Sequence, residues 1–158
     1  GEMAQVIRSV TLLDPAEGIK TLTGEQMDFG YRRSALTEHP DWIVLSAVFA
    51  LEDGDPAQIR AEMDALMARR RASQPLELPS AGSTFKRPEG HFAGTLIDQC
   101  GLKGLRVGGA QVSEKHAGFV VNRGGATCAD VTALIAQVQA RVLEKTGVRL
   151  EPEVRIVR

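Results

Sequence analysis

The sequence predicts an α+β protein, and three patterns lead to that prediction. Residues 5–51 contain segments rich in β-branched residues, separated by turn-forming sequences. Two later stretches repeat apolar residues at the spacing of one helical face. The last residues, 148–158, alternate apolar and charged side chains as a strand does. Strands and helices are therefore both expected in this chain.

The first segments predict three strands. Residues 5–14, QVIRSVTLLD, end in the turn-like sequence DPAEG, and IKTLT at 19–23 follows, which indicates a hairpin. Residues 25–36 are irregular. Residues 42–51, WIVLSAVFAL, form the longest apolar run and have the length of a buried strand.

A helix is predicted directly after the third strand. Asp55 is suited to the N-cap and Pro56 to the first helical position. An apolar face follows at helical spacing, formed by Ile59, Met63, Leu66 and Met67. Three arginines at 69–71 lie where cations favour a helix C-terminus, and they are either a solvated helix end or a functional cluster.

The composition changes after this helix. The sequence SQPLELPSAGS carries two prolines and predicts a boundary between residues 1–73 and residues 74–158. Ten of the sixteen glycines fall between residues 82 and 125. Because glycine lets backbone approach a ligand closely, this region is expected to be a binding surface more than a packed core.

A second helix is predicted from Thr127, with Asp130 placed to complete a capping box and Gly147 placed to end it. Its buried face would contain Val131, Leu134, Ile135, Val138 and Val142. The last segment, VRLEPEVRIVR, is predicted as a strand. Pro152 restricts that strand to a sheet edge or a bulge.

Composition and charge exclude several classes of protein. A formal net charge of −1 argues against a nucleic-acid binder that neutralises many phosphates. No apolar run reaches the roughly 18 residues of a membrane span, and no signal peptide is recognisable. Cys100 and Cys128 are too few for a zinc site and are expected to be small packing residues, so no metal and a reducing, cytoplasmic location are predicted.

Several polar residues have two possible interpretations by composition alone. The loop PSAGSTFKRP, residues 79–88, is either a polar turn or an anion-binding loop whose Ser83 does chemistry. His116 is either a surface histidine or a catalyst, and Glu153 is either ion-paired with Arg155 or functional. Neither GLKG nor GGA fits a P-loop or a dinucleotide fingerprint.

Taken in order, four blocks resemble the UDP-N-acetylenolpyruvoylglucosamine reductase family. They are FGYRRS at 29–34, RRRASQPLELPSAGSTFKRP at 69–88, HFAGTLIDQCGLKGLRVGGAQVSEKHAGFVVN at 91–122 and LEPEVRIV at 150–157. Together they cover nearly half of the residues. The uninterrupted GHFAG after FKRP resembles the shorter of the family's two types, which lacks a substrate-capping insertion.

The resemblance implies a flavoprotein oxidoreductase of peptidoglycan synthesis, and hence of cell wall biogenesis, cell shape and cell division. Members use FAD and NADPH to reduce UDP-N-acetylenolpyruvoylglucosamine to UDP-N-acetylmuramate. They are about twice as long, so residues 1–73 would be the tail of a flavin-binding α+β domain and residues 74–158 a small α+β substrate-binding domain. The absent N-terminal half would hold most FAD contacts, leaving this chain alone inactive. The alternative is a non-catalytic UDP-sugar-binding module or fragment.

The resemblance also assigns roles to individual residues. Ser83 matches the family's proton donor, Arg32 the arginine that stabilises an enolate, and Glu153 the catalytic glutamate. Lys103 matches a substrate-binding lysine. The remaining substrate-side residues are Lys86, Arg87, Gln74 and His116. The loop cations Lys86 and Arg87 are suited to a diphosphate.

Overall fold

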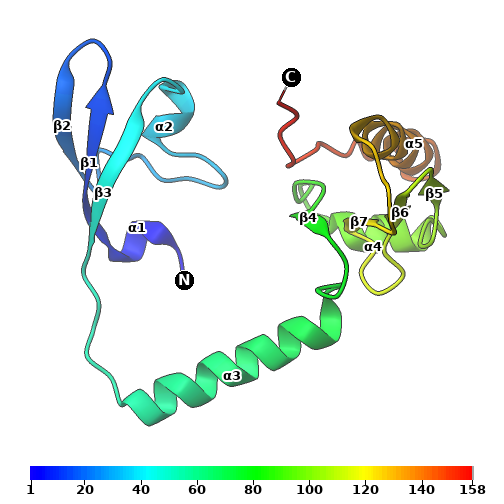
Figure 1. Ribbon diagram of the computed structural model, residues 1–158, viewed down its shortest axis with the longest axis horizontal. Helices are drawn as coiled ribbons and strands as arrows, with labels where there is room; N and C mark the ends of the chain where they lie inside the picture. Colours follow the sequence, from blue (N-terminus) through cyan, green and yellow to red (C-terminus); the bar gives the residue numbers. More distant parts are fainter. Residues whose placement is uncertain (158) are drawn as a thin grey trace. The chain divides into compact units, whose positions relative to one another are not determined.

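The computed structural model describes residues 1–157 and confirms a chain of mixed helices and strands (Figure 1). Its backbone contacts divide it into two compact units, Gly1–Gln58 and Ile59–Arg158, here called the N unit and the C unit. Each unit is described by itself. The boundary between these units falls after Gln58, near the start of the helix at Pro56–Ser73. The functional boundary after residue 73 is a different division of the chain, and it stays a prediction.

The N unit is a three-stranded antiparallel sheet with two short helices. Its elements are α1 (Met3–Val6), β1 (Ile7–Asp14), β2 (Gly18–Thr23), α2 (Ala35–Glu38) and β3 (Ile43–Phe49). The strand order is β2-β1-β3, and the β1–β2 pairing confirms the predicted hairpin. The first strand begins at Ile7 rather than residue 5, because Gln5 and Val6 lie in α1. On β1, Val10 and Leu12 are buried on one face.

Strand β3 forms within residues 42–51, as predicted, but it is not buried in this structure. All seven of its residues are exposed, including Phe49 at 48%. β3 pairs with β1 alone, and within the described residues no layer covers either of its faces. An apolar run predicts the strand, whereas burial also needs a layer packed against it.

Asp14 organises the turn between β1 and β2. Its side chain is buried, and its Oδ1 accepts hydrogen bonds from the backbone N–H of Ala16 at 2.8 Å and of Glu17 at 3.3 Å. Its Oδ2 accepts from Lys20 Nζ at 2.6 Å. The same ammonium lies 4.0 Å from the centre of the Trp42 ring. The turn is therefore held by a charged cluster next to the only tryptophan.

This cluster predicts an acid-sensitive N unit. The hydrogen bond from Lys20 and that from the Ala16 amide lower the pKa of Asp14 from 3.8 to about 2. Because the folded pKa is depressed, the stabilisation is complete above 3.8 and is lost as the pH falls towards 2. We expect the urea midpoint, followed by Trp42 fluorescence, to fall less steeply in Asp14→Asn than in wild type across this window. The exposed control Asp64→Asn should keep the wild-type slope, and an unchanged slope in Asp14→Asn would contradict the prediction.

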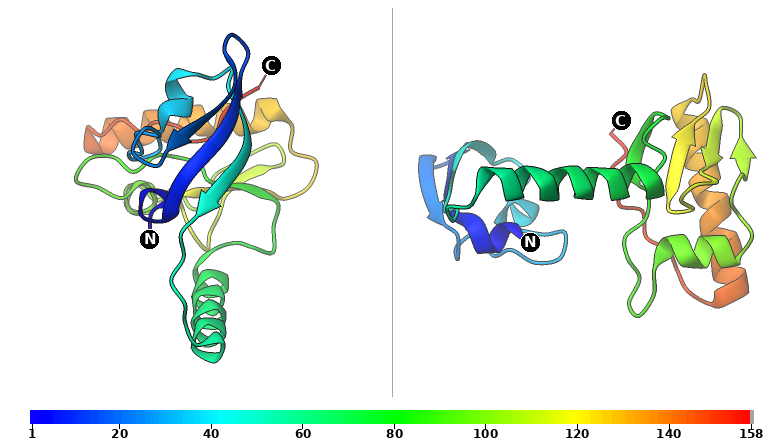
Figure 2. Two further views of the ribbon diagram at one scale, coloured as in Figure 1. Left: turned by 90° about the vertical axis from the view of Figure 1, so that its left-hand side faces the viewer. Right: turned by 90° about the horizontal axis from the view of Figure 1, so that it is seen from below.

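The C unit is a four-stranded sheet with helices packed against it. Its elements are α3 (Pro56–Ser73, which begins just before the boundary), β4 (Ser80–Ser83), α4 (Ala93–Gln99), β5 (Arg106–Val107), β6 (Ala110–Val112), β7 (Phe119–Asn122) and α5 (Cys128–Thr146). The strand order is β4-β7-β6-β5, and every pair is antiparallel. Helix α5 lies beside the sheet and contacts β5, β6 and α4 (Figure 2).

Helix α3 has the predicted N-terminus but not the predicted buried face. Asp55 Oδ1 accepts a hydrogen bond from the Ala57 amide at 3.0 Å, as an N-cap does. Its apolar face is exposed, and the structure, which describes the whole of α3, gives it no buried residue. Helical periodicity shows which side could pack, whereas a neighbouring surface decides whether it does.

Helix α5 agrees with its prediction in detail. Thr127 and Asp130 form the capping box, with the Asp130 amide donating to Thr127 Oγ1 at 3.1 Å and the Thr127 amide donating to Asp130 Oδ2 at 2.9 Å. Gly147 is the C-cap. Four of the predicted apolar residues are buried and the fifth, Val131, packs against them: the buried residues are Leu134, Ile135, Val138 and Val142. These local signals were sufficient to define the helix.

Two expectations need correction, one about the glycine-rich region at residues 82–125 and one about the cysteines. The glycine-rich region supplies much of the C-unit core, since Phe85, Ile97, Ala110, Val112 and Val120 are buried together against α5. Glycines there make turns between short core elements. The two cysteines also differ, because Cys100 is buried as expected whereas Cys128, on the first turn of α5, is exposed.

The predicted C-terminal strand is wrong. Among the described residues of this segment, 148–157, a single isolated bridge forms, between Phe85 and Pro152. The Lys86 amide donates to the Glu151 carbonyl at 2.8 Å, and the Glu153 amide donates to the Thr84 carbonyl at 2.8 Å. Pro152 has no N–H, so a regular ladder cannot pass through it.

Over the described residues, no helix is long and apolar enough to cross a membrane, and no metal-binding cluster is found.

Candidate functional site

The C unit brings Ser83 and Glu153 together around Thr84. Ser83 ends β4 opposite Phe119 of β7 and is exposed. The next residue, Thr84, is buried, and its amide donates to the Gly118 carbonyl at 2.8 Å. The Thr84 carbonyl accepts from the amide of the half-buried Glu153 at 2.8 Å. Glu153 is far from Ser83 in the sequence, and its backbone is bonded to the buried threonine that directly follows Ser83.

His116 is held beside the same strands. Its Nδ1 accepts a hydrogen bond from the Gly118 amide at 3.1 Å, and its own amide donates to Ser113 Oγ at 3.3 Å. Its ring packs edge-on against Phe119, with 5.0 Å between ring centres. Because Nδ1 is an acceptor here, the neutral ring carries its proton on Nε2. Gly118 connects His116 to Thr84, so His116 lies near the Ser83–Glu153 pair.

The two loop cations follow Ser83 on the same segment. Lys86 Nζ lies 3.2 Å from Glu151 Oε2, and both side chains are well exposed. The Arg87 guanidinium lies over the ring of Phe92, 4.0 Å from its centre. Stacking on an aromatic ring fixes the plane of the guanidinium, and the Arg87 Nε donates to the His91 carbonyl at 3.4 Å. The two cations are therefore close in sequence to Ser83 and accessible.

Gln74 lies just beyond the C-terminal end of α3. Its Oε1 accepts from Arg70 Nε at 3.2 Å. Lys115, next to His116, donates from Nζ to the Arg71 carbonyl at 2.7 Å and lies 3.5 Å from a carboxylate oxygen of Glu77. Lys115 thus fastens the end of α3 to the turn that carries His116. Gln74 and His116 belong to the same part of the C unit.

Lys103 lies in another part of the C unit, and Arg32 belongs to the N unit. Lys103 is between α4 and β5, and its Nζ is 2.7 Å from Asp98 Oδ2 in an exposed ion pair. Arg32 is in the N unit, with a positive φ of 57° and its guanidinium 5.6 Å from the centre of the Tyr31 ring. Its neighbour Arg33 pairs with Asp28 at 2.6 Å. The approach of Arg32 to Ser83 stays a prediction.

An apolar groove of about 540 Å³ lies between β4, β7, α5 and the C-terminal segment. None of the predicted catalytic or substrate-binding residues lines it. Its lining does include Ser80 and Thr84, which flank Ser83 in the sequence, and both hydroxyls are bonded to the backbone of Val120. Sequence reasoning missed these two residues, since hydroxyl side chains in a Gly- and Pro-rich loop carry no distinguishing signal.

Comparisons with known proteins agree with the motifs. The family described as UDP-N-acetylenolpyruvoylglucosamine reductase, C-terminal domain, matches residues 74–157. UDP-N-acetylenolpyruvoylglucosamine reductases of Levilactobacillus brevis and Clostridium perfringens are 55% and 53% identical over 99% of this chain and 51% of their own lengths. The crystal structure of UDP-N-acetylenolpyruvylglucosamine reductase from Thermus caldophilus superposes with a TM-score of 0.82 at 36% identity, covering 98% of this chain and 54% of that one.

This chain thus spans about half the length of the relatives that it matches. The resemblance predicted from the four sequence blocks is confirmed, and so is the α+β fold. The matched residues include the whole Ser83–Glu153 region. These matches show that the chain belongs to the UDP-N-acetylenolpyruvoylglucosamine reductase family and that its residues 74–157 are the C-terminal domain of that family.

Proposed function

We propose that this chain provides the substrate side of a cytoplasmic reductase that converts UDP-N-acetylenolpyruvoylglucosamine to UDP-N-acetylmuramate for peptidoglycan synthesis. The observation that carries the proposal is the placement of Ser83 and Glu153 on either side of Thr84. The names of the relatives support the substrate. FAD and NADPH are proposed as cofactor and reductant of the complete reductase.

The reaction adds two hydrogens across the enol ether double bond. In the complete reductase, FAD that has been reduced by NADPH would supply a hydride to the methylene carbon, and negative charge would develop on the adjacent carbon and its carboxylate. Ser83 donates the second hydrogen: its O–H bond breaks, and a C–H bond forms at the adjacent carbon. Lys86 and Arg87, close in sequence to Ser83, stabilise the negative charge left on the serine oxygen.

Arg32 and Glu153 complete the proposed chemistry. The Arg32 guanidinium binds the substrate carboxylate and stabilises the enolate, because a guanidinium presents two N–H groups to two carboxylate oxygens. Glu153 assists only if it is protonated or acts through an intervening donor, since an ionised carboxylate would repel the enolate. Its backbone amide is bonded to the carbonyl of Thr84, the residue that follows Ser83.

Binding of the nucleotide sugar falls to the exposed cations and their neighbours. Lys86, Arg87 and Lys103 carry the positive charge that a diphosphate requires. Gln74 and His116, which share one part of the C unit, supply uncharged hydrogen-bonding groups to the sugar. Asp98 orients Lys103 through a 2.7 Å ion pair that faces solvent.

The described residues of the N unit do not fit a complete FAD site. A dinucleotide diphosphate usually lies on a glycine-rich turn that leads into a helix N-terminus. The described helices of the N unit, α1 and α2, have four residues each, and neither follows a glycine-rich turn. The cofactor-binding residues of this chain therefore stay unassigned, and most of that site would be formed by residues outside it.

A rival proposal is that the chain is a non-catalytic UDP-sugar-binding module. The observation that favours it is that the chain matches only about half of its relatives' length. A chimera in which this chain replaces the matching half of the Levilactobacillus brevis relative decides between the two. Reduction of UDP-N-acetylenolpyruvoylglucosamine by the chimera would support the reductase, whereas a chimera that binds UDP-N-acetylglucosamine without reducing the substrate would support the module.

Lys103→Ala should weaken binding of UDP-N-acetylenolpyruvoylglucosamine, measured by calorimetry. Loss of a hydrogen bond from a charged group costs about 1.5–3 kcal/mol, so the dissociation constant should rise ~10- to 100-fold. The control is Arg60→Ala, which removes another exposed cation that is paired with an aspartate, Asp64. Equal affinities for Lys103→Ala and Arg60→Ala would remove Lys103 from the site.

A further inference from the structure

Strand β4 contains a β-bulge immediately before Ser83. Ser80 pairs with Val121 and Ser83 pairs with Phe119, so three steps along β4 match two steps along β7. Gly82, inside the bulge, has a φ of +89°, a conformation that favours glycine. The extra residue in β4 changes which residue lies opposite Ser83.

The bulge decides which face of the sheet carries Ser83. Directly opposed residues of an antiparallel pair project to the same face, so Ser83 shares the face of Phe119 and Val121. Without the extra residue, Ser83 would lie opposite Gly118 and project to the other face, because a slip of one residue reverses every side chain. The bulge is therefore a condition for the observed direction of Ser83.

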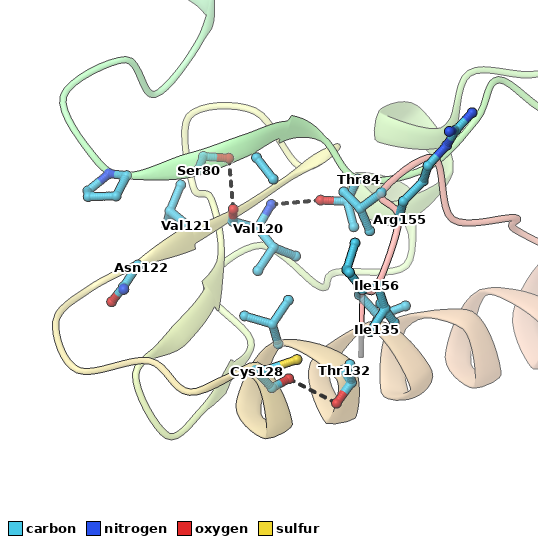
Figure 3. Close-up of a pocket in the computed structure, with 15 residues that line it drawn as sticks. Ser80, Thr84, Val120, Val121, Asn122, Cys128, Thr132, Ile135, Arg155 and Ile156 are labelled. Atoms are coloured by element: carbon cyan, nitrogen blue, oxygen red, sulfur yellow. Dashed lines mark hydrogen bonds between the residues drawn. The ribbon is translucent and has the colours of Figure 1, made fainter. Parts of the chain in front are cut away.

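Two hydroxyl groups form hydrogen bonds with β7 at the bulge. Their partner is the backbone of Val120, a residue that is only 8% exposed. Ser80 Oγ donates to the Val120 carbonyl at 2.9 Å, and the Val120 amide donates to Thr84 Oγ1 at 3.1 Å (Figure 3). Ser80 and Thr84 thus hold the two ends of the bulge on one buried residue, an arrangement here called the hydroxyl clasp.

Thr84 extends the clasp to the second catalytic residue. It is 3% exposed, and its three polar groups bond to three residues in two segments: the hydroxyl to Val120 of β7, the amide to Gly118 just before β7, and the carbonyl to Glu153 of the C-terminal segment. A shift of Thr84 would therefore move Ser83 and Glu153 together. Neither hydroxyl of the clasp is part of the proposed chemistry.

We propose that Thr84 and Ser80 are positioning residues, which hold the bulge and so orient Ser83 toward the substrate carbon, while Thr84 also keeps the backbone of Glu153 in place. This inference rests on the proposed proton transfer from Ser83. Misplacement of a reacting group by about 1 Å can cost ~10²-fold in rate. Loss of the Thr84 hydroxyl should thus slow proton transfer strongly without changing how tightly the nucleotide sugar binds.

The test uses a chimera in which this chain replaces the matching half of the Levilactobacillus brevis relative. Stopped-flow absorbance follows the reoxidation of reduced FAD by UDP-N-acetylenolpyruvoylglucosamine in Thr84→Val, Thr84→Ser, Ser83→Ala and the double variant Ser83→Ala/Thr84→Val. We expect Thr84→Val to be slower by ~10²-fold at saturating substrate, and Thr84→Ser to recover most of the rate. In the Ser83→Ala background, Thr84→Val should cost much less than in the wild-type background, because only its effect through Glu153 remains. Thr132→Val, which removes a hydroxyl bonded within α5, is the control and should behave as wild type.

Three results would overturn the inference: a wild-type rate in Thr84→Val, equal rates in Thr84→Val and Thr84→Ser, or a full additional loss in the double variant. A normal rate in Ser83→Ala would instead overturn the proposed function, and the inference with it. Amide exchange of Val120, measured in the 158-residue chain, tests the clasp itself, since exchange should be faster in Thr84→Val than in Thr84→Ser. Should Thr84→Val fail to fold, Ser80→Ala removes the other hydroxyl of the clasp. The same loss of rate is expected for Ser80→Ala, and a wild-type rate in that variant would overturn the inference.

Discussion

Replacing Ser83 with alanine should slow the reduction of UDP-N-acetylenolpyruvoylglucosamine by about 10²–10⁴-fold, the usual contribution of a positioned proton donor. Reduction of FAD by NADPH should be unchanged, because that half-reaction takes no proton from Ser83. Ser83→Cys should recover part of the rate, since a thiol is a stronger acid than a hydroxyl. Stopped-flow measurement of both half-reactions in the chimera separates these effects.

The outcomes of this experiment distinguish a chemical role from a structural one. Equal slowing of both half-reactions would mean that Ser83 supports the fold or the flavin. If neither half-reaction were slower, the interpretation of residues 79–88 as a simple polar turn would be supported. Ser73→Ala is the matched control, because this exposed serine at the end of α3 donates only to the Arg69 carbonyl among its described hydrogen bonds.

Gly109→Ala should destabilise the C unit by about 3 kcal/mol, at the upper end of the usual cost of overpacking. A Cβ at this position would lie 2.4 Å from the Ala126 amide nitrogen and 2.5 Å from the Gly124 carbonyl oxygen. Those backbone atoms cannot swing away as a side chain could, because Asn122 Oδ1 accepts from the amides of both Gly124 and Ala126. The same loop leads into α5, so its displacement would disturb the start of that helix.

Urea unfolding followed by far-UV circular dichroism measures this loss. The control is Gly90→Ala, where a Cβ meets nothing within 4 Å and only the positive φ of +69° opposes the side chain. We expect about 1 kcal/mol for the control, the cost of left-handed backbone in a non-glycine residue. If the two variants lost the same stability, the close packing at Gly109 would not be the cause.

Local sequence signals predicted those elements whose determinants lie within the element itself. Thr127, Asp130 and Gly147 start and end α5, and the apolar spacing between them gives its buried face. The β1–β2 hairpin is similar, because the turn and both strands are contiguous. The motif blocks also predicted the family, which depends on residue identity and order and not on packing.

Burial was predicted less well than secondary structure. β3 and α3 both form where their patterns predict, yet their apolar side chains are exposed. The C-terminal segment alternates like a strand but forms a single bridge, since Pro152 lacks the N–H that a ladder needs. In each case the pattern describes what a segment could do, and the neighbouring segments decide what it does.

By itself, the sequence determined the family, the α+β class and the residues proposed for chemistry. The tertiary structure alone decided how those residues meet: Ser83 and Glu153 lie beside Thr84, and His116 reaches the same place through Gly118. It also revealed the bulge and the hydroxyl clasp on Val120. The physical reason is that strand register and the pairing of buried backbone groups depend on residues far apart in the chain, which no local pattern records.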